Sequence, residues 1–176
     1  MGDMSSVEGK IHPITYYGTP VLHRECQQVT KFDDELAQLV ADMFASMYEA
    51  NGVGLAANQI GIDASVFVYD CPDATGEHQI GHVVNPTLIT PALPVARYLD
   101  DEGCLSVPGE HAELERATLA QVTGFDQTGK PITVDGTGLL ARCLQHEVDH
   151  LLGTVYVDRL SAEERQRVLT AAGLPT

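Results

Sequence analysis

Two histidines and a glutamate near the C-terminal end of the chain have the spacing of a metal site. His146, Glu147 and His150 form an HExxH sequence. Side chains four residues apart share one face of a helix, so both imidazoles can bind one ion. The glutamate beside the first histidine can reach a metal-bound water without binding the ion. The chemistry this pattern favours is metal-assisted hydrolysis. The alternative is an ordinary polar helix face that contains two histidines.

The helical phase of the surrounding residues favours the metal site. At about 100° per residue, one arc of the helix collects the apolar side chains, Leu139, Leu140, Cys143, Leu144 and Leu151. His146, Glu147 and His150 fall in this inward arc. The positions expected to point away from it are Ala141, Gln145 and Asp149. Ionisable groups on a buried stripe are costly unless they are paired or bind a metal.

A third protein ligand is expected upstream of this helix, because a catalytic site usually has three protein ligands and an open position for water. No histidine or cysteine follows His150, and Glu163 and Glu164 begin what looks like a solvated helix. Cys104, in the stretch DEGCLS, is the best candidate, since a thiolate suits Zn²⁺ or Fe²⁺. The weaker candidates are Cys143, one turn before the first histidine, and His82 and His111.

The stretch GVGLAANQIG at residues 52–61 contains the glycine spacing of a dinucleotide-binding turn. A dinucleotide site needs this turn between a strand and a following helix. Here the expected order is reversed, with a helix before the glycines and a strand after them. The glycines are better explained by the close approach of a peptide backbone.

The helix before that loop is predicted from apolar side chains at helical spacing, Leu36, Leu39, Val40, Met43, Phe44, Met47 and Tyr48. Asp33 or Asp34 can cap its start, and Gly52 suits its end. Residues 1–32 before it are expected to form an irregular arm with Pro13, Gly18 and Pro20 as breakers. The first residues, MGDMSS, formally match a myristoylation pattern, to which little weight is given.

The remaining elements favour an α+β fold. The HExxH helix is expected from Leu139 to Leu152, ended by Gly153, and a C-terminal helix is expected from Ser161, with Glu164 at capping-box spacing. Strands are predicted at Ser65–Tyr69, Gly81–Ile89, Val95–Leu99, Leu119–Phe125, Ile132–Val134 and Thr154–Val157. A hairpin turn is expected at residues 126–129. The predicted architecture is a single domain of mixed or antiparallel strands packed around the central HExxH helix, with residues 161–176 as C-terminal helix and tail.

Composition excludes several classes of protein. The chain has 176 residues and a formal net charge of −15, which repels phosphate backbones and anionic membranes and so argues against DNA and membrane partners. No apolar run approaches the roughly 18 residues of a membrane span. The four cysteines form no CxxC pair, and Cys26, Cys71 and Cys143 are expected to be core residues. Reduced thiols and the absence of a signal-peptide pattern predict a cytoplasmic protein, with a monomer as the default.

Three stretches together resemble the peptide deformylases, the metal hydrolases that remove the N-formyl group from newly made polypeptides. They are GVGLAANQ at residues 52–59, EGCLS at 102–106 and QHEVDH at 145–150, in the order that the family carries them. The resemblance is strong from about residue 50 to residue 160 and weak in the N-terminal arm. It implies a formylmethionine-directed hydrolase that releases formate.

The resemblance implies a role for each motif residue. Cys104, His146 and His150 would bind the metal, with Fe²⁺ as the native ion and Zn²⁺ or Ni²⁺ as substitutes. Glu147 would be the general base and acid for the attacking water. Gln59 and the backbone N–H of Leu105 would stabilise the oxyanion at the formyl group. Glu102 would not bind the metal itself but would pair with Arg116 and support the Cys104 segment.

The implied substrates are N-formylmethionyl nascent peptides, with transient ribosome contact left open. The residues expected to bind them are Val53, Gly54, Leu105, Leu139 and Cys143, and Gly54 and Leu105 could pair with the peptide backbone. Two positions depart from the family pattern. His111 stands where an arginine often holds the substrate, and Arg142 stands near the pocket where an apolar residue is common.

Two other functions compete with this one. A zincin-type metallopeptidase would share HExxH but needs a ligand after the helix, and the EGCLS stretch has no place in it. A structural metal module, or a relative without activity, would have no use for Glu147 and Gln59.

Overall fold

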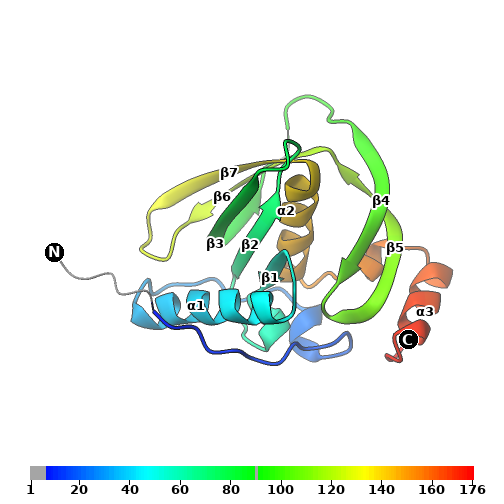
Figure 1. Ribbon diagram of the computed structural model, residues 1–176, viewed down its shortest axis with the longest axis horizontal. Coiled ribbons are helices and arrows are strands. Elements are labelled where there is room, and N and C mark those ends of the chain that lie inside the picture. The colour runs from blue at the N-terminus through cyan, green and yellow to red at the C-terminus, as the bar shows by residue number, and fades with distance from the viewer. Residues whose placement is uncertain (1–6, 90) are drawn as a thin grey trace.

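Helix α2 (Gly138–Leu151), which carries the HExxH residues, runs through the middle of the molecule. The structure is a computed structural model, which describes residues 7–89 and 91–176. On one side of α2 lies a five-stranded sheet, and on the other a curved two-stranded hairpin (Figure 1). This arrangement is the expected α+β fold around a central helix.

The large sheet has the strand order β1-β2-β3-β6-β7, and every pairing in it is antiparallel. Its strands are β1 (Gly54–Ala56), β2 (Val66–Pro72), β3 (His78–Leu88), β6 (Leu119–Phe125) and β7 (Pro131–Thr137). The predicted turn between β6 and β7 is confirmed, and Gly129 there has a φ of 90°. The short β1 continues the GVGLAANQ loop, so that loop borders α2.

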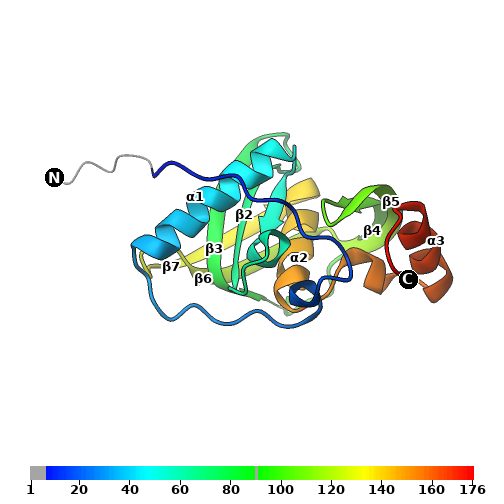
Figure 2. The ribbon, with the colours of Figure 1, turned by 90° about the horizontal axis from the view of Figure 1, so that it is seen from below.

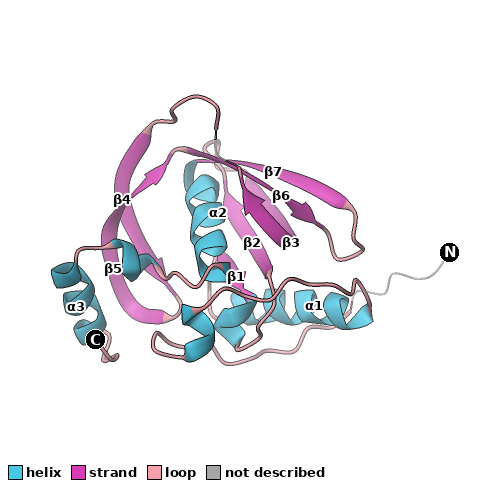
Figure 3. Cartoon of the chain, turned by 180° about the vertical axis from the view of Figure 1, so that it is seen from behind, coloured by secondary structure: helices cyan, strands magenta, loops and turns pink. Residues whose placement is uncertain are grey.

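The hairpin pairs β4 (Arg97–Cys104) with β5 (Val107–Ala117). Strand β5 was not predicted, because four of its eleven residues are charged and Pro108 and Gly109 stand near its start. The alternation of buried and exposed side chains that is typical of a strand is nevertheless present: Ala112 and Leu114 are buried, while Glu113 and Glu115 are exposed. On this buried side, Ala112 and Leu114 pack with the 3-10 helix at Tyr156–Arg159 and with α3 (Ala162–Ala171), and Arg116 bonds to Asp149 of α2. The hairpin lies on the side of α2 opposite the large sheet (Figure 3).

Helices α1 (Asp34–Glu49) and α3 (Ala162–Ala171) begin as predicted. Asp33 accepts a hydrogen bond from Leu36 N at 3.2 Å, and Ser161 accepts one from Glu164 N at 3.1 Å. Helix α1 packs its apolar stripe against β1 and β2 (Figure 2). At its end the left-handed residue is Asn51, with a φ of 57°, rather than Gly52.

Two predictions about the C-terminal half are wrong. Residues 154–157 do not form a strand; the chain instead makes a 3-10 helix at Tyr156–Arg159. The three residues of α2 that were expected to point outward, Ala141, Gln145 and Asp149, are all buried. The reason is that the hairpin and the sheet enclose α2 between them, while Leu139, expected inward, is 42% exposed at the start of the helix.

The described part of the N-terminal arm, residues 7–32, is irregular apart from a 3-10 helix at Pro20–His23. The myristoylation pattern at residues 1–6 lies outside the described residues. Among the helices that are described, none is long and apolar enough to cross a membrane.

Candidate metal centre and active site

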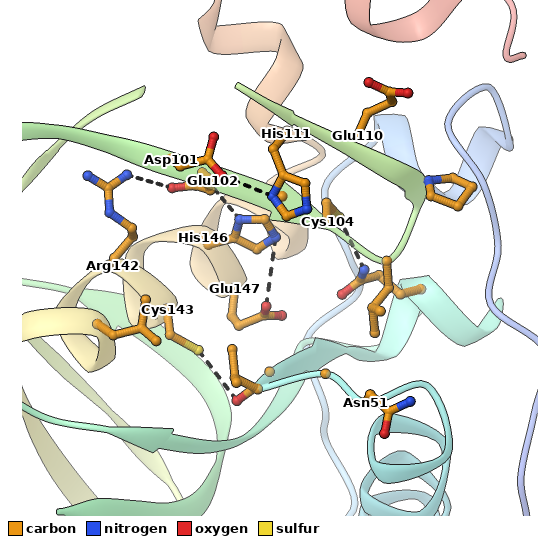
Figure 4. Close-up of a pocket in the computed structure, with 18 of the residues that line it drawn as sticks. Asn51, Asp101, Glu102, Cys104, Glu110, His111, Arg142, Cys143, His146 and Glu147 are labelled. Carbon is orange, nitrogen blue, oxygen red and sulfur yellow. Dashed lines mark hydrogen bonds and ion pairs between the residues drawn. The ribbon is translucent and has the colours of Figure 1, made fainter. Parts of the chain in front are cut away.

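Cys104, His146 and His150 bring their ligand atoms together where the end of β4 meets α2. Figure 4 shows two of them, Cys104 on the hairpin and His146 on α2. Cys104 Sγ lies 3.2 Å from His150 Nε2, which lies 3.1 Å from His146 Nε2. Tetrahedral bonds of about 2.0–2.3 Å place donor atoms roughly 3.3–3.6 Å apart. One thiol and two imidazole nitrogens at these separations fit a single divalent ion.

The weaker ligand candidates have other partners. The thiol of Cys143 donates to the Val53 carbonyl at 3.7 Å. His82 Nε2 accepts a bond from a backbone N–H at 2.9 Å, and His111 pairs with Asp101 at 3.3 Å. Within the described residues, the Cys104 set is the one group of three that could hold a metal.

The two imidazoles are prepared for metal binding in different ways. His146 Nδ1 lies 2.9 Å from the Glu102 carboxylate, which leaves Nε2 directed at the other ligands. His150 is fully buried, and its Nδ1 finds no partner among the described residues. Burial lowers the pKa of His150 well below its ordinary value, so the ring is neutral, the form that binds a metal.

Glu102 is held by more cations than the sequence suggested. Its predicted pair with Arg116 is present, with bonds of 2.7 and 3.1 Å, and Arg142 adds a third at 2.9 Å. Burial acts to raise the pKa of this carboxyl. The hydrogen bonds from His146 and Arg116 outweigh burial and hold the pKa well below its ordinary value, so the group is ionised.

Glu147 lies beside the ligand atoms, with Oε1 3.9 Å from His146 Nε2. The residue is 3% exposed, and its Oε2 has no hydrogen-bond partner in the described part of the chain. Burial raises the pKa of Glu147 to about 7. A carboxyl group with a pKa near the working pH can both accept a proton and return it.

Gln59 is 1% exposed and its amide is fixed in orientation. Its Oε1 accepts a bond from Ala56 N at 3.0 Å, and its Nε2 donates to Ser106 Oγ at 3.1 Å. The same nitrogen reaches Cys104 Sγ at 3.5 Å. The amide N–H group therefore faces the ligand cluster.

Cys104, His146, Glu147 and Gln59 line one cavity of about 440 Å³, whereas His150 is fully buried and is not among its lining residues. All the residues expected to bind substrate line it: Val53, Gly54, Leu105, Leu139 and Cys143. A Cβ atom on Gly54 would lie 2.7 Å from Cys143 Sγ and 3.0 Å from Glu147 Oε1, so a side chain here would displace these groups where β1 passes the site. Arg142 and His111 line the cavity too.

Sequence reasoning missed two contributors to the site. Ser106 belongs to the EGCLS stretch, yet its bond to Gln59 depends on two segments meeting in space. Asp149 was expected to face solvent but bonds to Arg116 and Arg159, each at 2.7 Å. The signal that could have found Asp149 is its place in the helix that carries the ligands.

Comparisons with known proteins agree with this site. A family model described as polypeptide deformylase matches residues 11–166. Peptide deformylase 1 of Streptomyces avermitilis is 59% identical over 164 residues, which cover 92% of this chain and 75% of that protein. Peptide deformylase 2 of Streptomyces coelicolor is 52% identical over 168 residues, covering 96% and 93%. The crystal structure of a peptide deformylase from Legionella pneumophila has a TM-score of 0.84 at 38% identity, and the match covers 93% of this chain and 94% of that one. The chain therefore belongs to the polypeptide deformylase family, the metal-dependent hydrolases that remove the N-formyl group from nascent polypeptides.

Proposed function

We propose that this chain hydrolyses the formamide at the N-terminus of N-formylmethionyl polypeptides, with formate and a free α-amine as products. The observation that carries the proposal is the meeting of four groups beside the cavity. They are the Cys104 thiol, the two imidazole nitrogens, and the Glu147 carboxylate with an oxygen free to accept a proton. A thiol and two imidazoles that can hold a metal ion, beside a buried carboxylate that can accept a proton from water, are the groups that metal-assisted hydrolysis of an amide requires.

We propose that Cys104, His146 and His150 hold one divalent ion, Fe²⁺ in the cell, with Zn²⁺ or Ni²⁺ able to replace it. One thiolate and two imidazoles suit each of these ions. When bound, the ion supplies Lewis acidity and brings the pKa of a water molecule close to neutral. The N–H group of Ser106 lies 3.4 Å from Cys104 Sγ and supports the sulfur as a thiolate.

Glu147 moves the proton in this proposal. It takes a proton from the attacking water and delivers it to the departing amine nitrogen. Its burial supports the role, because a desolvated carboxylate is a stronger base than one in water. Its nearness to His146 keeps it beside the atoms that react.

The formyl oxygen becomes negatively charged as its carbon is attacked. Gln59 Nε2 and the backbone N–H of Leu105 are the proposed donors to it, and both residues line the cavity. The bonds from Gln59 to Ala56 and Ser106 fix its amide before substrate binds, and donors held in advance stabilise an oxyanion best.

The methionine side chain is proposed to occupy the part of the cavity lined by Val53, Leu139 and Cys143. The following residues would pair with the backbone near Gly54 and Leu105, which accepts any peptide sequence. We further propose that residues 1–176 form one catalytic domain that acts as a monomer in the cytoplasm. Transient contact with the ribosome would supply its substrates.

A direct test is to purify the protein without oxygen, measure its metal content and assay formate release from a formyl-Met peptide. About one ion per chain and steady release of formate are expected. The matched control is the same peptide with an acetyl group, whose extra methyl group a site fitted to formyl should reject. Cleavage of internal peptide bonds, or equal turnover of the acetyl peptide, would point instead to a metallopeptidase or a general amidase.

A further inference from the structure

Glu102 receives four hydrogen bonds on its two carboxylate oxygens. Oε2 accepts from Arg116 Nη2 at 2.7 Å and lies 2.9 Å from His146 Nδ1. Oε1 accepts from Arg116 Nε at 3.1 Å and from Arg142 Nη1 at 2.9 Å. The rotation of this carboxylate, and therefore the direction of its bond to the His146 ring, depends on both arginines.

Arg142 is itself held firmly in place. It lies one helical turn before His146 on α2, so the two side chains reach Glu102 from the same helix face. Its guanidinium donates to the Leu114 carbonyl at 3.0 Å and to the Tyr98 carbonyl at 3.2 Å, one from each strand of the hairpin. The guanidinium carbon also lies 4.7 Å from the centre of the Tyr98 ring. The side chain is 3% exposed, so water does not compete for these bonds.

Arg116 cannot replace Arg142 at Glu102, because Arg116 is shared. Its Nη1 donates at 2.7 Å to Asp149, which Arg159 also holds with two bonds of 2.7 Å. Arg116 already uses Nε and Nη2 for Glu102 and Nη1 for Asp149, so all three of its nitrogens are engaged. Without Arg142, Oε1 would retain only the longest of the four bonds.

We propose that Arg142 is a positioning residue for the metal ligand His146, acting through Glu102. This inference rests on the proposed metal site. Arg142 does not touch the ion or the reacting atoms. It fixes the Glu102 carboxylate, which fixes the imidazole ring so that Nε2 points at the metal position. Metal retention, and not only the packing of the hairpin, depends on this arginine.

The test compares Arg142→Met with Arg159→Met. Both substitutions remove a guanidinium from a buried carboxylate of the same network, but Arg159 bonds to Asp149 and not to Glu102. Each protein is loaded with Zn²⁺, and the rate of Zn²⁺ release to excess chelator is measured, together with the thermal midpoint of the metal-free form. Arg142→Met is expected to release Zn²⁺ about tenfold faster than the unchanged protein. Loss of a residue that supports a metal ligand typically lowers metal affinity by about 10–100-fold, and tenfold is the low end of that range. Arg159→Met should release it at close to the unchanged rate.

Release from Arg142→Met at the unchanged rate, or equal acceleration in both variants, would overturn the inference. If the unchanged protein holds no Zn²⁺, the proposed metal site itself fails, which is a separate outcome. If Arg142→Met does not fold, Arg142→Lys and Arg142→Gln provide the comparison. Lysine keeps a cation beside Glu102 and should release Zn²⁺ more slowly than glutamine, whereas equal release from the two would count against the inference.

Discussion

Replacing Glu147 with glutamine is expected to stabilise the metal-free protein while removing its activity. The carboxylate is 3% exposed and its Oε2 has no partner among the described residues, so the charged form is poorly solvated. Glutamine has nearly the same shape but cannot ionise. The substitution therefore removes a buried charge without opening a cavity. The same change removes the proton carrier, for which a rate loss of about 10²–10⁴ is typical.

The magnitude follows from the pKa. Burial raises the pKa of Glu147 from 4.5 to about 7. A difference of about 2.5 pKa units at about 1.4 kcal/mol each amounts to roughly 3 kcal/mol. Between pH 4.5 and about 7 the folded protein holds this proton more tightly than the unfolded chain does, so the free energy of unfolding falls as pH rises. The glutamine variant does not lose stability in this way. The difference in free energy of unfolding between the variant and the unchanged protein should therefore grow from pH 4.5 to about 7 and stay constant above it.

Urea unfolding of both proteins in the presence of a chelator, at a series of pH values from about 4.5 to 8, measures this difference. Glu147 also raises the pKa of His146, so the comparison measures Glu147 together with its effect on that ring. Added Zn²⁺ should shrink the advantage of the variant, because a nearby cation stabilises the carboxylate. A stability difference that stays constant with pH would refute the argument, since it would show that the carboxylate is not desolvated.

Three further outcomes are expected. Gln59→Ala should lower kcat for a formyl-Met peptide by about 10²–10³ with little change in KM, measured by steady-state kinetics, because a donor to the oxyanion is lost. Gly54→Ala should lower kcat/KM in the same assay, because its Cβ would lie 2.7 Å from Cys143 Sγ. Glu102→Gln should cost about 3–5 kcal/mol in urea unfolding at pH 7, since it leaves buried cations unpaired. The pKa of Glu102 is held below its ordinary value, so this stability difference should shrink as pH falls below about 4.5.

The chemistry of the site was predictable because it depends on residue types at short, fixed spacings. Two histidines one helical turn apart need only a helix to meet at one ion, and the local sequence predicts that helix. Assignment of the third ligand was less secure. Cys104 was only slightly favoured on general grounds, and the family resemblance carried the choice. The structure brings it within 3.2 Å of His150 across 46 residues of sequence.

Parts of the fold were not predictable from local pattern. Strand β5 has too many charges to resemble a strand, since its exposed face is acidic and its buried face includes Arg116. The helical phase of α2 indicated an apolar side and a polar side. In the folded protein both sides of α2 are buried, because a hairpin from a distant part of the chain covers the polar side as well.

The sequence by itself determined which groups do the chemistry: the HExxH residues, the cysteine and the glutamine of the glycine-rich loop. The histidines and the glutamate stand at helical spacing and constrain one another locally, whereas the cysteine and the glutamine were assigned through the family resemblance. Only the tertiary structure decided how those groups are held. The contacts of Glu102 with Arg142, of Arg116 with Asp149 and of Gln59 with Ser106 join segments far apart in the chain. Such ion pairs and hydrogen bonds leave no periodic signal, because they depend on how the hairpin and the sheet close around α2.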